Sequence, residues 1–182
     1  YPSTAIDASV RAGVDSIEHG SFAPPASFAL MKANGTFLVP TLTVYDVFYK
    51  VARDNPELLR PGTAAKEMAN DLLPKQNFPL ALKSGVRIVY GTDLGEGDHS
   101  TEFRLFIEGG MSPMEAILSA TRNAAELLGA AADIGSVQQG RYADLVAVKG
   151  NPLQSPDLLG QIGFVMKGGT VVRQNGAATG IQ

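Results

Sequence analysis

The chain has 182 residues, of which 45% are hydrophobic and 18% are charged. This balance is typical of one globular domain, or one and a part, with enough residues to bury a sizeable core. The net charge of −3, without a basic run, argues against a nucleic-acid partner. The lack of cysteine excludes disulfides and thiolate metal sites, and no apolar run reaches the roughly 18 residues of a membrane span. We therefore expect a soluble protein, cytoplasmic by default, without a membrane partner.

Helices alternate with short apolar strands in the first half of the chain. The N-terminus, Tyr1-Pro2-Ser3-Thr4, lacks an initiator methionine and the pattern of a signal peptide, so we expect it to lie within a longer polypeptide. Pro74 and Pro79 should kink or split the longest predicted helix. The predicted elements are a helix at 3–12, a strand at 14–19, a helix at 26–33, a strand at 36–39, helices at 44–53 and 63–83, and a strand at 86–91.

Three of these helices end in a glycine that leads at once into a strand, at Gly13, Gly35 and Gly85. Glycine supplies the left-handed C-cap and the short turn that such a connection needs. Strands and helices that alternate on short connections are typical of βαβ units and a parallel sheet. The strands are almost continuously apolar, as expected for a sheet covered on both faces.

The second half of the chain changes from helical to β-rich. A polar, glycine-rich loop at 94–99 carries no phosphate-binding fingerprint, which disfavours a sugar-phosphate enzyme. A helix at 100–108 and an amphipathic helix at 113–128, capped by Ser112, should follow. Beyond these we predict β-runs at 145–148, 164–167 and 170–173, a tight hairpin at Gly168-Gly169, and a loose segment at 176–182.

Three parallel strands are too few for an open doubly wound sheet, and they suit the last strands of a (β/α)₈ barrel, which typically needs about 250 residues. The fold class is therefore α/β, with two regions. Residues 1–133 are predicted to be a partial barrel, and residues 134–182 part of a small β module.

Polar residues stand where two of the predicted strands end. His19 ends the first strand and Asp93 follows the third, and the carboxyl ends of parallel strands share one rim. Imidazole is a good metal ligand near neutral pH, and a carboxylate can hold a water and accept its proton. Gly91, on the same strand face as Asp93, is expected to leave room beside a metal.

Four segments resemble a known family when they are taken together and in order: 17–20 (Ile-Glu-His-Gly), 91–93 (Gly-Thr-Asp), 120–129 (Ala-Thr-Arg-Asn-Ala-Ala-Glu-Leu-Leu-Gly) and 134–146, which contains Gly-Arg-Tyr-Ala-Asp-Leu-Val. They resemble the C-terminal part of the amidohydrolase superfamily, in its imidazolonepropionase-like and Xaa-Pro-dipeptidase-like branch. The resemblance covers nearly the whole chain.

The resemblance implies a metal-dependent hydrolase of amide or peptide C–N bonds, with Xaa-Pro dipeptides or acyl-amino acids as substrates. It makes the three strands the sixth to eighth of a barrel and adds a small β-sandwich. His19 and Asp93 match metal ligands for one or two divalent ions, with zinc expected, and Asp93 also matches the general base. A cyclic amidohydrolase or a deaminase of the same superfamily is the alternative.

The resemblance leaves most of the family's metal ligands without a counterpart in this chain. The missing N-terminal half, or another chain, would have to supply them, and we expect a homo-oligomer because the partial barrel leaves unpaired strand edges. A non-catalytic remnant or assembly module is the second alternative.

Other polar residues are expected at the rim, on a helix surface or in a turn. His99 and Tyr45 are candidate substrate-binding residues at the rim. Glu102 and Arg104 are expected to be charges on a helix surface, and Asp144 is expected to stabilise a turn in the β module.

Overall fold

A short parallel sheet organises the first part of the fold. The computed structural model describes residues 3–70 and 72–179. Strand β1 (Ser16–Glu18) pairs with β2 (Phe37–Val39), with Ile17 opposite Leu38. Leu38 also forms a parallel bridge with Ile88, supported by hydrogen bonds from Leu38 N to Arg87 O and from Val89 N to Leu38 O, both 2.9 Å. The parallel order predicted from the sequence is therefore confirmed.

The predicted strand at 86–91 is wrong in its extent, because only the bridge at Ile88 is strand-like. Its outer edge is bonded to helical groups and not to another strand. The side-chain amide of Asn123 donates to Ile88 O at 2.9 Å, and Tyr90 N donates to Ser119 O at 3.1 Å. These contacts satisfy backbone groups that a neighbouring strand would otherwise pair.

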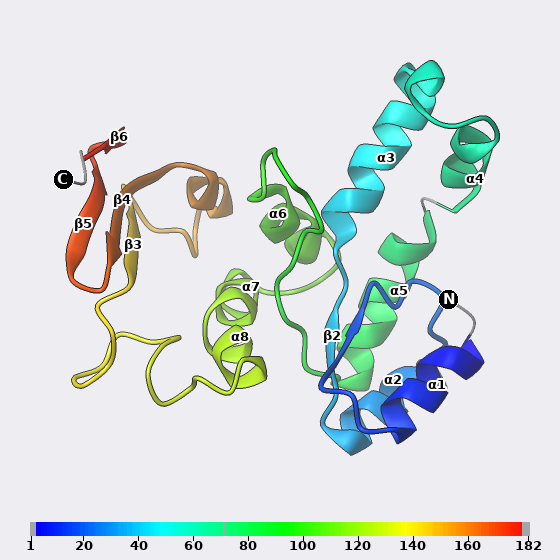
Figure 1. Ribbon diagram of the computed structural model, residues 1–182, viewed down its shortest axis with the longest axis horizontal. Helices are drawn as coiled ribbons and strands as arrows, with labels where there is room; N and C mark the ends of the chain where they lie inside the picture. The colour runs from blue at the N-terminus through cyan, green and yellow to red at the C-terminus, as the bar shows by residue number, and fades with distance from the viewer. Residues whose placement is uncertain (1–2, 71, 180–182) are drawn as a thin grey trace.

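Three helices, α1 (Ser3–Arg11), α2 (Pro25–Asn34) and α5 (Leu72–Ser84), pack side by side against the sheet (Figure 1). Their inner faces share one core with the sheet. The predicted glycine stops are confirmed, since Gly13, Gly35 and Gly85 all have positive φ. The largest fully buried apolar side chains of this core are Phe28, Phe78, Phe106, Met31, Leu38, Leu42 and Val10.

Helix α3 (Leu42–Asp54) leaves the sheet, and η1 (Pro56–Leu58) and α4 (Thr63–Asn70) follow it at the far end of the molecule from the β-strands of the C-terminal part (Figure 1). The helix predicted over 63–83 is two helices, α4 and α5, with residue 71 outside the described residues. Pro79 lies inside α5 and does not split it.

Helices α6 (Thr101–Glu108), α7 (Pro113–Ala120) and α8 (Arg122–Leu127) follow the glycine-rich loop at 94–99. Ser112 and Glu115 form the predicted cap as a reciprocal capping box. The single helix predicted over 113–128 is wrong, because it breaks at Thr121, where φ is −123° and ψ is −86°. The carbonyl of Ser119 accepts from Tyr90 N, and the Thr121 hydroxyl donates back to Ile117 O at 2.8 Å, so the regular helical pattern is interrupted there.

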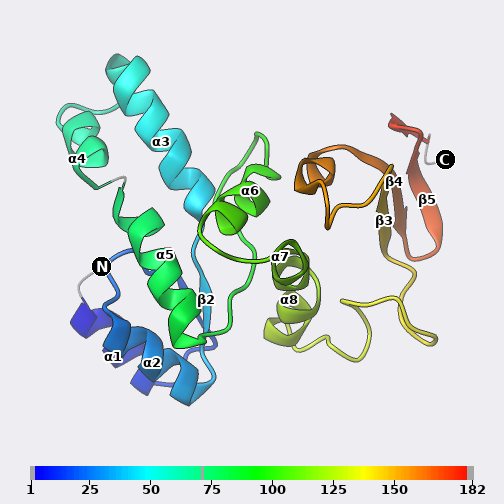
Figure 2. The same cartoon turned by 180° about the vertical axis from the view of Figure 1, so that it is seen from behind.

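The C-terminal part is a four-stranded antiparallel sheet in the order β3-β4-β5-β6, seen from behind in Figure 2. The hairpin at Gly168-Gly169 is confirmed, and Asp144 stabilises it by accepting from Gly168 N at 2.6 Å and Lys167 Nζ at 2.7 Å. The segment predicted to be loose contains β6, while residues 180–182 lie outside the described residues. The elements are β3 (Leu145–Val148), η2 (Pro156–Gly160), β4 (Ile162–Lys167), β5 (Thr170–Gln174) and β6 (Ala177–Ala178).

The division into a barrel part and a β module at residue 133, and a β-sandwich, stay predictions. None of the helices in residues 3–70 and 72–179 combines the length and the apolar character that crossing a bilayer demands.

Candidate active site

His19 and Asp93 come together at the carboxyl ends of the parallel strands. His19 directly follows β1, and Asp93 follows the bridged segment at Ile88. The Nε2 atom of His19 lies 3.8 Å from Oδ2 of Asp93. The two side chains are 28% and 59% exposed, respectively, so the pair faces solvent and is open to a small molecule.

The backbone at this rim is strained at three residues. His19, Thr41 and Asp93 have φ values of 67°, 50° and 54°, in the left-handed region that non-glycine residues rarely adopt. Each such residue costs on the order of 1–3 kcal/mol and persists only when surrounding contacts enforce it. Each of the three follows a different parallel segment, so the strain is concentrated where the chain turns out of the sheet.

Thr41 orients the His19 ring. Its Oγ1 lies 2.7 Å from His19 Nδ1, and the backbone N–H of His19 donates to Val39 O at 2.8 Å. With Nδ1 engaged, Nε2 is the ring nitrogen that faces Asp93. A partner on the second ring nitrogen is the usual way in which proteins fix a metal-ligating histidine.

The donors present fit part of a divalent-metal site. A separation of 3.8 Å between His19 Nε2 and Asp93 Oδ2 is compatible with one ion bound to both, since zinc bonds to nitrogen and carboxylate oxygen are about 2.0–2.2 Å each. A catalytic zinc normally has three protein ligands. In the part of the chain that the structure describes, no three His, Cys, Asp or Glu side chains are grouped closely enough to hold an ion.

His99 lies beside the loop that carries Asp93. Its Nδ1 is 2.8 Å from the hydroxyl of Thr92, and its backbone carbonyl accepts from the Tyr90 hydroxyl. Burial raises the pKa of Tyr90, and the negative charge of Glu102 adds to the effect. These contacts fix the loop between Tyr90 and His99 and place His99 near the rim.

Tyr45 lies on α3, beside the His19 ring. Its ring meets the imidazole edge to face, with ring centroids 5.9 Å apart and an angle of 83° between the planes. The ring therefore forms part of the wall around His19. Of the four residues singled out at the rim, the structure brings His19, Asp93 and Tyr45 together and holds His99 through Thr92.

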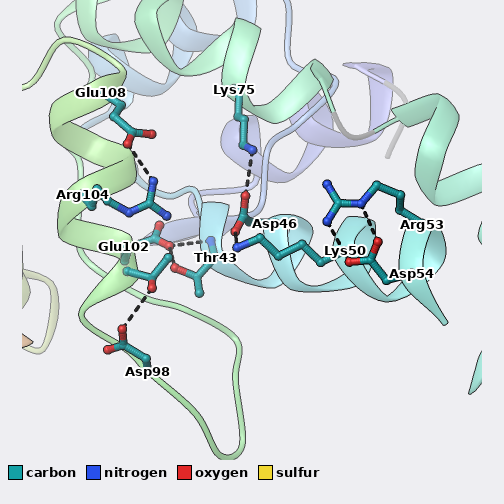
Figure 3. Close-up of polar contacts among 11 residues, drawn as sticks. Thr43, Asp46, Lys50, Arg53, Asp54, Lys75, Asp98, Glu102, Arg104 and Glu108 are labelled. Carbon is teal, nitrogen blue, oxygen red and sulfur yellow. Dashed lines mark hydrogen bonds and ion pairs between the residues drawn. The ribbon is translucent and has the colours of Figure 1, made fainter.

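Glu102 is buried, and the prediction that it is a surface charge is wrong. Its side chain is fully buried on α6. Figure 3 shows it pointing toward Thr43 on α3, whereas Arg104 pairs at the exposed surface with Glu108 at 2.7 Å. Oε1 of Glu102 accepts from Leu42 N at 2.8 Å, and Oε2 accepts from Thr43 N at 2.6 Å and from the Thr43 hydroxyl at 2.5 Å.

The burial of Glu102 decides its titration. Desolvation raises the pKa of this carboxyl to about 7, although the hydrogen bonds from Thr43 and Leu42 favour the ionised form. Three donors therefore compensate the burial of the carboxylate only in part.

The space beside Gly91 serves packing within the sheet. A Cβ at Gly91 would lie 2.5 Å from Cγ1 of Val39. The expectation that this glycine makes room beside a metal is therefore wrong, because its missing side chain leaves room for Val39 on the neighbouring strand.

Thr41 and Glu102 are the site residues that sequence reasoning missed. Thr41 carries no local signal, because its contact with His19 joins residues 22 positions apart. Glu102 does carry one. Leu105 and Phe106 lie three and four positions after it and are buried, so helical periodicity places Glu102 on the apolar face of its helix.

Comparison with known proteins identifies the family. The model of the amidohydrolase family matches residues 3–173. Ochratoxinase of Aspergillus niger is 33% identical over 177 residues, which are 94% of this chain and 36% of that protein. Imidazolonepropionase of Shouchella clausii is 34% identical over 128 residues, which are 65% of this chain and 28% of that protein.

The solved structures include a close match. A Xaa-Pro dipeptidase with methionine bound in its active site has a TM-score of 0.90 and 34% identity to this chain, and the match covers 94% of this chain and 43% of the dipeptidase. The mixed α/β fold thus corresponds to the C-terminal part of such enzymes, and the chain spans less than half the length of these relatives. The chain belongs to the amidohydrolase family.

Proposed function

We propose that this chain forms one wall of the active site of a metal-dependent hydrolase that cleaves amide or peptide C–N bonds. The observation that carries the proposal is the pairing of His19 Nε2 with Asp93 Oδ2 at 3.8 Å, with the other ring nitrogen of His19 bonded to Thr41. A ligand-type nitrogen and an exposed carboxylate at the rim of a parallel sheet are the parts that hydrolysis with an activated water requires.

Asp93 is proposed as the general base. Its carboxylate takes a proton from a water molecule whose oxygen bonds to the substrate carbonyl carbon. The same carboxyl then gives that proton to the leaving nitrogen as the C–N bond breaks. A divalent ion, when bound, lowers the pKa of water and polarises the carbonyl. His19 and Asp93 would hold it from this chain, with zinc as the expected ion because of the nitrogen and carboxylate ligands.

The substrate class is proposed from the relatives and covers dipeptides ending in proline and acyl-amino acids. The similarity to a Xaa-Pro dipeptidase supports it. His99 and Tyr45 are proposed to contact the substrate, since Tyr45 packs against the His19 ring and His99 is bonded to Thr92, the residue before Asp93. Both side chains can form hydrogen bonds with a carboxylate or carbonyl oxygen.

The remaining ligands are proposed to come from another segment of the same polypeptide or from a second chain. Two observations support this. The chain spans 43% of the dipeptidase, and a hollow of about 350 Å³ lies along β1, lined by residues that include Ile6, Val14, Ile17 and His19. The open edge of β1 is a place where a further strand can pair.

The test is hydrolysis by the full-length protein supplied with zinc. An Ala-Pro dipeptide and an N-acyl amino acid are the substrates. Asp93→Asn should lower kcat by at least 100-fold, and His19→Ala should lower both the zinc content and the rate. Asp144→Asn, which removes a carboxylate from the distant hairpin, is the matched control. Unchanged turnover in both site variants would refute the assignment.

A cyclic amide is the second candidate substrate, because imidazolonepropionase is also a relative. Turnover of a cyclic amide without turnover of the dipeptide would favour it. A non-catalytic assembly module is the alternative from another class, since the described residues do not supply a third ligand. Stoichiometric zinc in the purified full-length protein, lost with His19→Ala, would exclude it.

A further inference from the structure

The first turn of α3 is capped in an unusual way. Thr41 stands at the N-cap position, where a threonine hydroxyl ordinarily accepts a hydrogen bond from one of the first helical amides. It makes no such bond here, because its hydroxyl is bonded to His19 Nδ1. The amides of Leu42 and Thr43 are bonded instead to the buried carboxyl group of Glu102, which comes from α6, about 60 residues later in the chain.

We propose that Glu102 is a positioning residue for His19, acting through Thr41. By binding the first two amides of α3, Glu102 takes over the capping that Thr41 would otherwise provide and leaves the Thr41 hydroxyl to orient the imidazole. This proposal rests on the proposed function, in which His19 is a metal ligand.

The bonds to the α3 amides stabilise the ionised form of Glu102 and offset part of the cost of its burial. A negative charge at a helix N-terminus is favourable, and a carboxylate bound to backbone N–H groups forms stronger hydrogen bonds than a neutral hydroxyl does. Thr41 is also held in the left-handed region, with φ of 50°, which a β-branched residue adopts only under constraint. The bonds from Leu42 and Thr43 to Glu102 lie immediately after Thr41 and supply that constraint.

Glu102 also connects the two loops that form the site. Its own backbone N–H donates to His99 O at 3.3 Å, and α6 begins just after the loop that carries Asp93. One residue thus joins the loop after the third parallel segment to the turn that bears Thr41. A change at Glu102 should move His19 relative to Asp93 although it touches neither.

The proposal is tested with Glu102→Gln in the full-length protein. Glutamine keeps the size of the side chain, but it places an amide group where carboxylate oxygens now accept three hydrogen bonds. The matched control is Glu108→Gln on the same helix, whose carboxylate is exposed and bonded to Arg104. Asp46→Asn is a second control, because Asp46 anchors α3 to α5 through Lys75 at 2.9 Å, away from Thr41.

Three measurements separate positioning from a general loss of stability. In the metal-free protein, hydrogen exchange of the Leu42 and Thr43 amides should become at least tenfold faster, and the ring-nitrogen NMR signals of His19 should shift. Zinc affinity should fall about tenfold, the lower end of the range for residues that support metal ligands. Glu108→Gln and Asp46→Asn should leave the His19 signals and the zinc affinity unchanged.

A double-mutant cycle identifies the path. Thr41→Val removes the hydroxyl that contacts His19 and keeps the shape of the side chain. If Glu102 acts through Thr41, adding Glu102→Gln to Thr41→Val changes the His19 signals and zinc affinity no further. Additive effects would contradict the path through Thr41. If Glu102→Gln does not fold, Thr43→Val removes one of the three donors and is measured in the same way.

The outcomes also distinguish this proposal from the proposed function. Unchanged His19 signals and unchanged amide exchange in Glu102→Gln would refute the positioning role even in an active hydrolase. Changed signals in a protein that hydrolyses none of the substrates would support the positioning role and refute the proposed hydrolase.

Discussion

The Thr41 hydroxyl lies 2.7 Å from Nδ1 of His19, and this contact selects the ring nitrogen that faces Asp93. A hydrogen bond to a ligand histidine fixes both its ring orientation and its tautomer. Thr41 should therefore affect a metal bound at His19 although it would not contact the metal itself.

Thr41→Val should lower zinc affinity of the full-length protein by about 10–100-fold, the usual effect of removing the partner of a metal-ligating histidine. Thr41→Ser, which keeps the hydroxyl, should stay close to wild type. Calorimetric zinc titration measures both. Thr36→Val is the control, since Thr36 is also buried but bonds to Val14 O at the opposite end of β2. It should cost about 1 kcal/mol of stability and leave zinc affinity unchanged.

The sequence predicts His19 and Asp93 as site residues but not Thr41, which orients His19. His19 and Asp93 stand out because each follows an apolar strand, and the order of the parallel segments follows from the glycine stops. Thr41 does not, because its role depends on a positive φ and on a contact across 22 residues. The break at Thr121 is equally tertiary, since it depends on Tyr90 binding a helical carbonyl. Glu102 was predictable from the buried Leu105 and Phe106 on its helical face.

Gly91→Ala should destabilise the protein by about 1–3 kcal/mol, the usual cost of overpacking a core. The added methyl group would lie 2.5 Å from Val39 Cγ1. Gly95→Ala is a matched control, because a Cβ there meets no atom within 4 Å. Urea unfolding measures both. In the double variant with Val39→Ala, the total loss should be smaller than the sum of the single losses, and full additivity would contradict the steric explanation.

The free energy of unfolding should decrease as pH rises from about 4.5 to about 7 because of Glu102. Its carboxyl pKa is raised from 4.5 to about 7 by burial, so the folded protein binds more protons than the unfolded chain in this range. The stabilising contribution is full below the unfolded pKa and is lost as pH rises through the folded pKa. The pKa difference corresponds to about 3 kcal/mol.

The comparison with Glu102→Gln isolates this contribution from other titrations. Asp46, for example, makes a contribution to stability with the opposite pH dependence. Its burial acts to raise the pKa of its carboxyl, but Lys50 and Lys75 outweigh this and lower it. The stability that Asp46 contributes is therefore lost as pH falls. Subtracting the unfolding free energies of Glu102→Gln from those of wild type, pH by pH, should leave a difference that declines toward neutral pH. A flat difference would show that the pKa of Glu102 is not raised in the folded protein.

The isolated 182-residue chain should self-associate through the open edge of β1. Ser16–Glu18 pairs on one side with β2, while the outer edge of the segment at Ile88 is bonded to Asn123 and Ser119. Within residues 3–70 and 72–179, the outer edge of β1 is therefore open to another strand. Ser16→Lys places a charge on this edge and should lower the association measured by sedimentation.

Leu58→Lys is the control, because it removes an apolar side chain that is 73% exposed elsewhere and should not lower the association. A larger effect of Leu58→Lys would mean that exposed apolar surface, and not strand pairing, drives association, and a sharply monomeric wild-type chain would exclude both.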